Sequence, residues 1–239
     1  MKYKLVIFDF DGTLADTFPF ALNVMDQVVE KYGLKKIDRS EIESLRHLEA
    51  RKVLKHFDVP LWKLPAISSH VMGLLGEQVH LLKLFEGIDQ LLKDLSNGGI
   101  KLGVVTSNSY ENVVKILGPE NAALIEYYEC GVRVFGKQSK LKKVLKQSGI
   151  EAEDAICIGD EIRDIQAAEK VHISFGAVGW GFTNIEALKA CGPAEVFVTV
   201  GEIAQKVAES STEGGFLGFG GERVSEGERA FLSELKGAL

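Results

Sequence analysis

Cysteine is scarce in this chain. Its 239 residues include three cysteines, Cys130, Cys157 and Cys191, and no two of them have CxxC spacing. An odd number without paired spacing argues against both a disulfide framework and a zinc site. Cys157 lies inside an apolar run, where a cysteine is most simply a small core residue. The cysteines therefore indicate neither redox nor zinc chemistry.

Long runs of lysine and arginine are also missing, as is any apolar stretch close to membrane-spanning length. With a formal net charge of -6, neither nucleic acid nor an anionic membrane surface is an expected partner. Met1 leads directly into a strand-like segment without a charged-then-apolar signal region, so we expect a cytoplasmic location. The composition is compatible with a monomer and does not define the oligomeric state.

Hydrophobic residues make up 46% of the chain, enough to bury one large domain or a core with a smaller insert. Short apolar runs, which predict buried strands, alternate with segments of helical periodicity. The predicted strands cover 4–10, 102–105, 155–158, 173–178 and 195–198, and the predicted helices 88–95, 111–117, 141–147, 165–169 and 203–209. This alternation predicts an α/β fold with a doubly wound parallel sheet of the Rossmann-like kind.

The alternation stops between residues 18 and 85, where only helical spacing is found. We therefore expect a core formed by 1–15 and 86–209, with an all-helical cap over 16–85. The cap leaves the core directly after the first strand, where an α/β sheet opens onto its ligand crevice. Residues 210–239 begin with a Gly- and Ser-rich stretch and are expected to form a flexible tail, with a short amphipathic helix over 225–235.

Two aspartates follow the first predicted strand. In extended chain Asp9 and Asp11 point to the same side, and Gly12 allows a sharp turn behind them. Two adjacent carboxylates call for a cation, and Mg²⁺ is the natural choice. Asp9 could then attack a phosphorus atom, while Asp11 could act as acid and base. A solvated Asp-Gly turn explains the same residues when they are taken alone.

Hydroxyl and amide groups follow the second predicted core strand, at Thr106, Ser107 and Asn108. Together with the start of the next helix, such donors can hold phosphate oxygens. Ser and Asn are also common helix caps, and in isolation that explanation is favoured.

A lysine is expected to balance the charge of a phosphoryl group. The candidates lie in 135–143, where Lys137, Lys140, Lys142 and Lys143 cluster and most must belong to a solvated helix face. Lys137 follows Gly136 just before the helix and can reach the strand edge. Lys140 remains the alternative.

Acidic residues follow the strand predicted at 155–158. Asp160 stands at the strand tip, where it could bind a metal, and Asp164 lies one helical turn further on, close enough to share the site. Glu161 can be explained by the helix dipole alone. These four segments together make a complete phosphoryl-transfer set.

The segments DFDGTL, TSN, the lysine before a helix and GDEIRD resemble, in order and spacing, the four motifs of the haloacid dehalogenase-like superfamily. The segment 16–85 looks like the helical cap of its phosphoglycolate phosphatase-like members. The resemblance implies a Mg²⁺-dependent phosphatase that hydrolyses a small phosphorylated metabolite through an aspartyl-phosphate.

The resemblance also implies a role for each residue. Asp9 would be the nucleophile and a metal ligand, and Asp11 the acid and base, with its carbonyl on the metal. Asp160 would bind the metal, and Asp164 would support the metal or the lysine. Lys137 and Thr106 would bind the phosphate. The same site would be lined by Gly12, Ser107 and Asn108. The proline that usually follows the lysine is replaced by Gln138.

Specificity is expected to come from the cap. Arg46 falls in a segment that resembles the family's substrate-facing loop, and His47 is a second candidate for binding an anionic substrate. Arg51 is better explained as a solvated residue. In the later loop Trp180 is expected to pack rather than to contact substrate.

Other functions remain open. A dehalogenase has no leaving oxygen to protonate, so Asp11 favours phosphate esters. A phosphonatase would use a cap lysine, and a phosphomutase would transfer to a sugar phosphate; nothing in the insert singles out either. The loss of a carboxylate would support a noncatalytic binding module. All four are present, namely Asp9, Asp11, Asp160 and Asp164.

Overall fold

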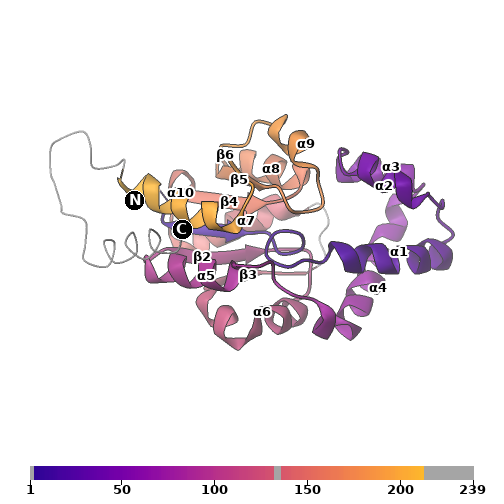
Figure 1. Cartoon of the computed structure of the whole chain (residues 1–239), viewed down its shortest axis with the longest axis horizontal. Helices are drawn as coiled ribbons and strands as arrows, with labels where there is room; N and C mark the ends of the chain where they lie inside the picture. The colour runs from indigo at the N-terminus through magenta and orange to yellow at the C-terminus, as the bar shows by residue number, and fades with distance from the viewer. Residues whose placement is uncertain (1–2, 132–135, 213–239) are drawn as a thin grey trace.

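A six-stranded parallel sheet forms the centre of the molecule (Figure 1). The computed structural model describes residues 3–131 and 136–212. The strands are β1 (Leu5–Phe8), β2 (Lys101–Val105), β3 (Tyr127–Glu129), β4 (Ala155–Gly159), β5 (Ser174–Val178) and β6 (Glu195–Phe197). Their order is β3-β2-β1-β4-β5-β6, and every neighbouring pair is parallel. The predicted doubly wound α/β fold is confirmed.

Strand β1 is central and buried on both faces. Val6 and Phe8 enter one hydrophobic cluster, and Leu5 and Ile7 enter the cluster on the opposite face. Burial on both faces explains why this strand reads as a continuous apolar run. The next strand in the chain pairs on one side of β1 and β4 pairs on the other. The strand order therefore reverses between β1 and β4, and in sheets of this kind ligands bind at such a switch point, outside the carboxyl ends of the strands.

Helices cover both faces of the sheet. One face carries α5 (Ile88–Asn97), α6 (Tyr110–Leu124) and α10 (Val200–Thr212), and the other carries α7 (Lys137–Ser148), α8 (Ile162–Glu169) and α9 (Ile185–Lys189). Helix α10 is longer at both ends than the predicted 203–209. The remainder of the predicted tail, including the helix expected over 225–235, lies outside the described residues.

Two elements escape the sequence patterns. Strand β3 has three half-buried residues at the edge of the sheet, so it has no apolar run to mark it. Helix α9 has five residues, which is too short for a helical period to be recognised.

The segment between β1 and α5 is helical. It contains α1 (Phe18–Tyr32), α2 (Ile42–Leu45), α3 (Ala50–His56) and α4 (Leu64–Glu77), which we call the cap, and the short 3-10 turns Arg39–Glu41, Leu61–Lys63 and Val79–Leu81. Phe20 and Val24 of α1 pack on Leu75 of α4. The two ends of the segment meet where Asp16 N donates to Lys83 O at 2.9 Å. The expected all-helical insert is present, while its domain limits at 16 and 85 stay a prediction.

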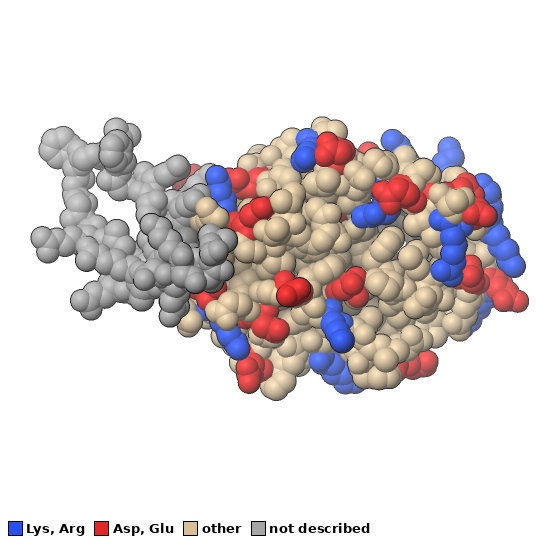
Figure 2. Space-filling view, in the orientation of Figure 1, with Lys and Arg blue, Asp and Glu red and all other residues tan. Residues whose placement is uncertain are grey.

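The cap helices lie beyond the sheet, on the right of Figure 1. On the face seen in Figure 2, acidic and basic side chains are interspersed, and at the cap end the two signs lie next to each other. Across residues 3–131 and 136–212, the helices are all too short or too polar to cross a bilayer.

Candidate active site

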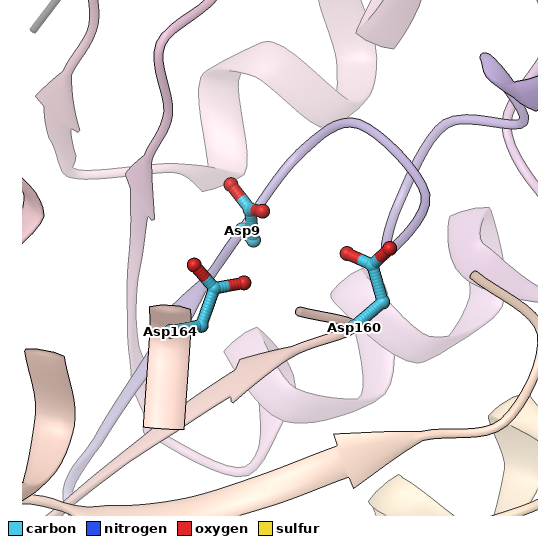
Figure 3. Close-up of side chains that lie close together, drawn as sticks. All are labelled: Asp9, Asp160 and Asp164. Atoms are coloured by element: carbon cyan, nitrogen blue, oxygen red, sulfur yellow. The ribbon is translucent and has the colours of Figure 1, made fainter. Parts of the chain in front are cut away.

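Three buried carboxylates gather at the carboxyl edge of the sheet. Asp9 follows β1, Asp160 follows β4, and Asp164 lies in the first turn of α8. One oxygen of each carboxylate lies within 4.8 Å of the other two, and all three side chains are buried. Figure 3 shows Asp9 and Asp164 close together and the Asp160 carboxylate beside the loop that follows β1. Buried like charges at this spacing fit a cation, and an all-oxygen set suits Mg²⁺.

Asp160 is held from two sides. Its Oδ1 accepts a hydrogen bond from Thr13 Oγ1 at 2.9 Å, and its Oδ2 accepts one from the Phe182 N–H at 2.7 Å. Gly12 has a φ of 77°, and a side chain there would collide with the Asp160 carboxylate. Both the conformation and the close approach therefore require glycine at this turn.

Lys137 connects two of the carboxylates. As the first residue of α7, it places its Nζ 2.9 Å from Asp9 Oδ1 and 2.8 Å from Asp164 Oδ1. Burial alone would lower the pKa of Lys137, but the Asp164 and Asp9 charges raise it above its ordinary value. The lysine is therefore charged next to Asp9.

Lys140 has a different position. Its ammonium donates to the Thr106 carbonyl and, at 2.7 Å, to the Gly131 carbonyl. Of the two lysines left open by the sequence, the one that contacts Asp9 is Lys137. Lys140 instead ties the loop after β2 to the end of β3.

The Asp11 carboxylate is bonded by the loop after β2 and is not one of the group of three. Asn108 Nδ2 donates to its two oxygens at 3.1 and 3.2 Å, and Thr106 Oγ1 lies 3.4 Å from Oδ2. Burial and the Asp9 charge raise the pKa of Asp11 to about 6. The Asp11 side chain is thus able to carry a proton close to neutral pH.

The loop after β2 is ordered by its own polar groups. Asn108 N donates to Thr106 Oγ1 at 2.9 Å, and the cap of helix α6 is Ser109, whose Oγ accepts from Asn112 N at 3.2 Å. Ser107 and Asn108 are therefore not needed as helix caps. Ser107 is half-buried, and among the described residues its hydroxyl bonds to no other side chain.

Burial raises the pKa of Asp164 to about 7 in spite of the Lys137 charge. Burial and the Glu161 and Asp9 charges also raise the pKa of Asp160 well above its ordinary value. The site therefore favours bound protons or a cation over three bare carboxylates.

Sequence reasoning missed three residues around this site. Thr13 lies within the DFDGTL segment, so its hydroxyl could have been considered there. Phe182 contributes a backbone N–H, which has no sequence signal. Arg163 pairs with Glu161, and its charge offsets part of the rise that burial and the Asp9 charge cause in the pKa of Asp11; it stands inside GDEIRD, where the sequence pattern assigns it no role.

The cap residues considered for substrate specificity differ in their contacts. The Arg46 guanidinium contacts the backbone carbonyls of Gly181 and Phe182, whereas His47 and Arg51 are exposed. Trp180 packs against the core, and its Nε1 donates to Thr13 O at 3.1 Å. Residues of the four motifs thus lie together at the carboxyl edge of the sheet, and Arg46 extends from the cap to the core backbone.

Comparisons with known proteins agree with this geometry. A family model described as haloacid dehalogenase-like hydrolase matches residues 6–178. The chain is 28% identical over 207 residues to a phosphoglycolate phosphatase of Synechococcus elongatus, covering 86% of this chain and 98% of that protein. It is 27% identical to an N-acetylmuramic acid 6-phosphate phosphatase of Pseudomonas aeruginosa, covering 83% and 91%. The crystal structure of a predicted phosphatase from Clostridium acetobutylicum has the same fold, with a TM-score of 0.75 at 22% identity, covering 87% and 100%.

Proposed function

Since this chain belongs to the haloacid dehalogenase-like hydrolase family, we propose that it is a Mg²⁺-dependent phosphatase that hydrolyses a small phosphate monoester through an aspartyl-phosphate on Asp9. The observation that carries the proposal is the division of labour between the two aspartates after β1. Asp9 lies against Lys137 and the other buried carboxylates, while Asp11 lies apart with a raised pKa. One is placed as a nucleophile and the other as a proton carrier.

The metal would be held by the carboxylates of Asp9 and Asp160 and by the Asp11 carbonyl, with Asp164 supporting the metal or Lys137. When bound, Mg²⁺ neutralises these carboxylates and lets a phosphate dianion approach Asp9. Lys137, the Thr106 hydroxyl and the loop at Ser107 and Asn108 would hold the transferring oxygens.

In the first half of the reaction an Asp9 carboxylate oxygen bonds to phosphorus and the bond to the ester oxygen breaks. Asp11 gives its proton to that leaving oxygen. In the second half Asp11, now ionised, takes a proton from water as the water oxygen attacks the same phosphorus. Inorganic phosphate leaves, and Asp9 and protonated Asp11 are restored.

Asp11 favours a phosphatase over a dehalogenase, because it would supply a proton that a carbon–halogen bond does not need. Phosphoglycolate is the first substrate to test and N-acetylmuramic acid 6-phosphate the second, since relatives of this chain carry those names.

The test is Mg²⁺-dependent phosphate release from a panel of phosphoglycolate, N-acetylmuramic acid 6-phosphate, sugar phosphates, nucleotides and an aryl phosphate. Wild type and Asp9→Asn would be compared, with circular dichroism to show that both are folded. We expect turnover in wild type alone and loss of it with chelator. Equal turnover in both proteins, or none on any ester, would overturn the proposal.

A further inference from the structure

Arg46 joins the cap to the core by hydrogen bonds from its guanidinium. Nε donates to the Phe182 carbonyl at 3.1 Å and Nη2 donates to the Gly181 carbonyl at 3.0 Å. Nη1 donates to Glu43 Oε2 at 2.9 Å. Two of the three bonded nitrogens therefore face the core backbone, in a fork that a lysine cannot reproduce.

Further contacts hold the same two segments together. Asn184 N donates to the Arg46 carbonyl at 2.8 Å. The rings of Phe18 in α1 and Phe182 meet edge to face with centroids 5.2 Å apart, and Arg46 Cζ lies 5.3 Å from the Phe18 centroid. The contact is thus a packed junction around Arg46 and more than a single surface hydrogen bond.

The peptide that Arg46 holds also contacts Asp160. The Gly181 carbonyl and the Phe182 N–H belong to one peptide group, and that N–H donates to Asp160 Oδ2 at 2.7 Å. A side chain at Gly181 would collide with Asp160, so the peptide lies directly against the carboxylate. A cation on the carbonyl strengthens the N–H as a donor, because bonds in a chain polarise one another.

We propose that Arg46 is a positioning residue that couples the cap to the metal site, because it fixes the peptide whose N–H orients Asp160. This rests on the proposed function only in taking Asp160 as a metal ligand. In this role Arg46 acts through the backbone. It does not need to bind the charged end of the substrate, which is the role that its place in the cap sequence suggested.

The experiment compares Arg46→Met with Arg39→Met. Arg39 is a matched control, since its guanidinium lies 3.4 Å from Leu22 O and from Asp26 Oδ2, both within the cap. Mg²⁺ binding is measured by calorimetry without substrate. We expect binding to weaken about 10-fold in Arg46→Met, as is usual when a partner of a metal ligand is lost, and to be unchanged in Arg39→Met.

A second readout is amide exchange of Phe182 in the metal-free proteins. We expect exchange at least about 10-fold faster in Arg46→Met than in Arg39→Met, because the peptide loses its anchor. Should Arg46→Met fail to fold, Arg46→Lys replaces it, with an effect in the same direction and smaller. Unchanged Mg²⁺ binding and unchanged exchange would overturn the proposal.

Kinetics separate this role from substrate recognition. With phosphoglycolate and with an aryl phosphate that lacks a carboxylate, Arg46→Met should lose the same factor in kcat/KM. A loss confined to phosphoglycolate, with normal Mg²⁺ binding, would make Arg46 a substrate-binding residue instead. If wild type hydrolyses no ester, the proposed function fails, while the binding and exchange measurements still decide the role of Arg46.

Discussion

Charged side chains are held differently at the carboxyl edge of the sheet and in the cap. At the edge, Lys137 bonds Asp9 and Asp164 at 2.9 and 2.8 Å, and all three are largely buried. In the cap, Arg39 and Asp26 are 3.4 Å apart and their side chains are 58% and 75% exposed. Buried ion pairs hold their charges in a fixed geometry, whereas exposed ion pairs contribute little to stability. The carboxyl edge of the sheet therefore fixes the positions of its charged groups, whereas the exposed charged residues of the cap can be replaced.

After the loss of turnover expected in Asp9→Asn, the largest effect is expected at Asp11. Asp11→Asn keeps the shape of the side chain but removes the carboxyl proton that we propose it gives to the leaving oxygen. We expect kcat/KM for phosphoglycolate to fall about 1,000-fold, within the range for a lost general acid, and less for an aryl ester, whose oxygen leaves without a proton. Steady-state phosphate release measures this, with Asp154→Asn at the exposed Lys4 pair as the control. Equal losses on both esters would contradict the assignment.

Lys137→Met is expected to have the next largest effect. Removing the ammonium leaves Asp9 and Asp164 without their shared cation and the phosphate without a counter-charge. We expect kcat to fall about 100- to 1,000-fold. Lys143→Met is the comparison, since Lys143 pairs with Glu129 and is 59% exposed. If both variants lost the same activity, the edge would not differ from an ordinary surface.

Stability should depend on pH through the buried carboxylates. The pKa values of Asp11 and Asp164 are raised from 3.8 to about 6 and about 7. The folded metal-free protein thus binds more protons than the unfolded chain between these pKa values. The stabilisation of the fold by protonated Asp11 and Asp164 is therefore complete below about pH 4 and is lost as the pH rises through about 7.

We therefore expect the Tm of the metal-free protein to fall over that range. Mg²⁺ at 100 times its Kd adds about 2.7 kcal/mol, which raises Tm by about 5–10 °C at pH 7.5 for a chain of this size. Asp164→Asn should flatten the pH dependence. Thermal melts check this, and a metal-free Tm that rises between pH 4 and 7 would be inconsistent with the raised pKa values.

Lys140→Met should have a moderate effect. Its ammonium bonds the carbonyls of Thr106 and Gly131, so its loss frees the loop after β2, which we propose binds phosphate, without removing a group proposed to contact substrate. We expect about a 10-fold lower kcat/KM, equivalent to one lost charged hydrogen bond, with partial recovery in Lys140→Arg. Activity as low as that of Lys137→Met would show that the two lysines had been assigned the wrong way round.

The smallest effect is expected on the cap surface. Arg39→Met should leave turnover unchanged and alter the free energy of unfolding by less than about 0.5 kcal/mol. Urea titration and phosphate release measure both quantities. A large loss of activity here would remove the contrast between the edge and the cap.

The parts that could be predicted from the sequence are those in which burial or chemistry leaves a mark along the chain. Strand β1 is buried on both faces and so shows an apolar run, and the site residues stand where such runs end. Strand β3 is a short edge strand and shows no run. Lys137 and Lys140 lie one turn apart on the same helix, so only the position of the helix decides which one reaches Asp9. The contact between Phe182 and Asp160 is made by backbone, which every residue but proline provides.

The most direct test of Asp9 as the nucleophile is to trap the phosphorylated protein. Mg²⁺-loaded wild type is mixed with the best substrate of the panel, quenched in acid within one turnover, reduced with borohydride, and mapped by mass spectrometry. The account predicts reductive modification at Asp9 and none in Asp9→Asn. Turnover with no modification at Asp9, or with the phosphoryl group on Ser107 or another residue, would contradict it.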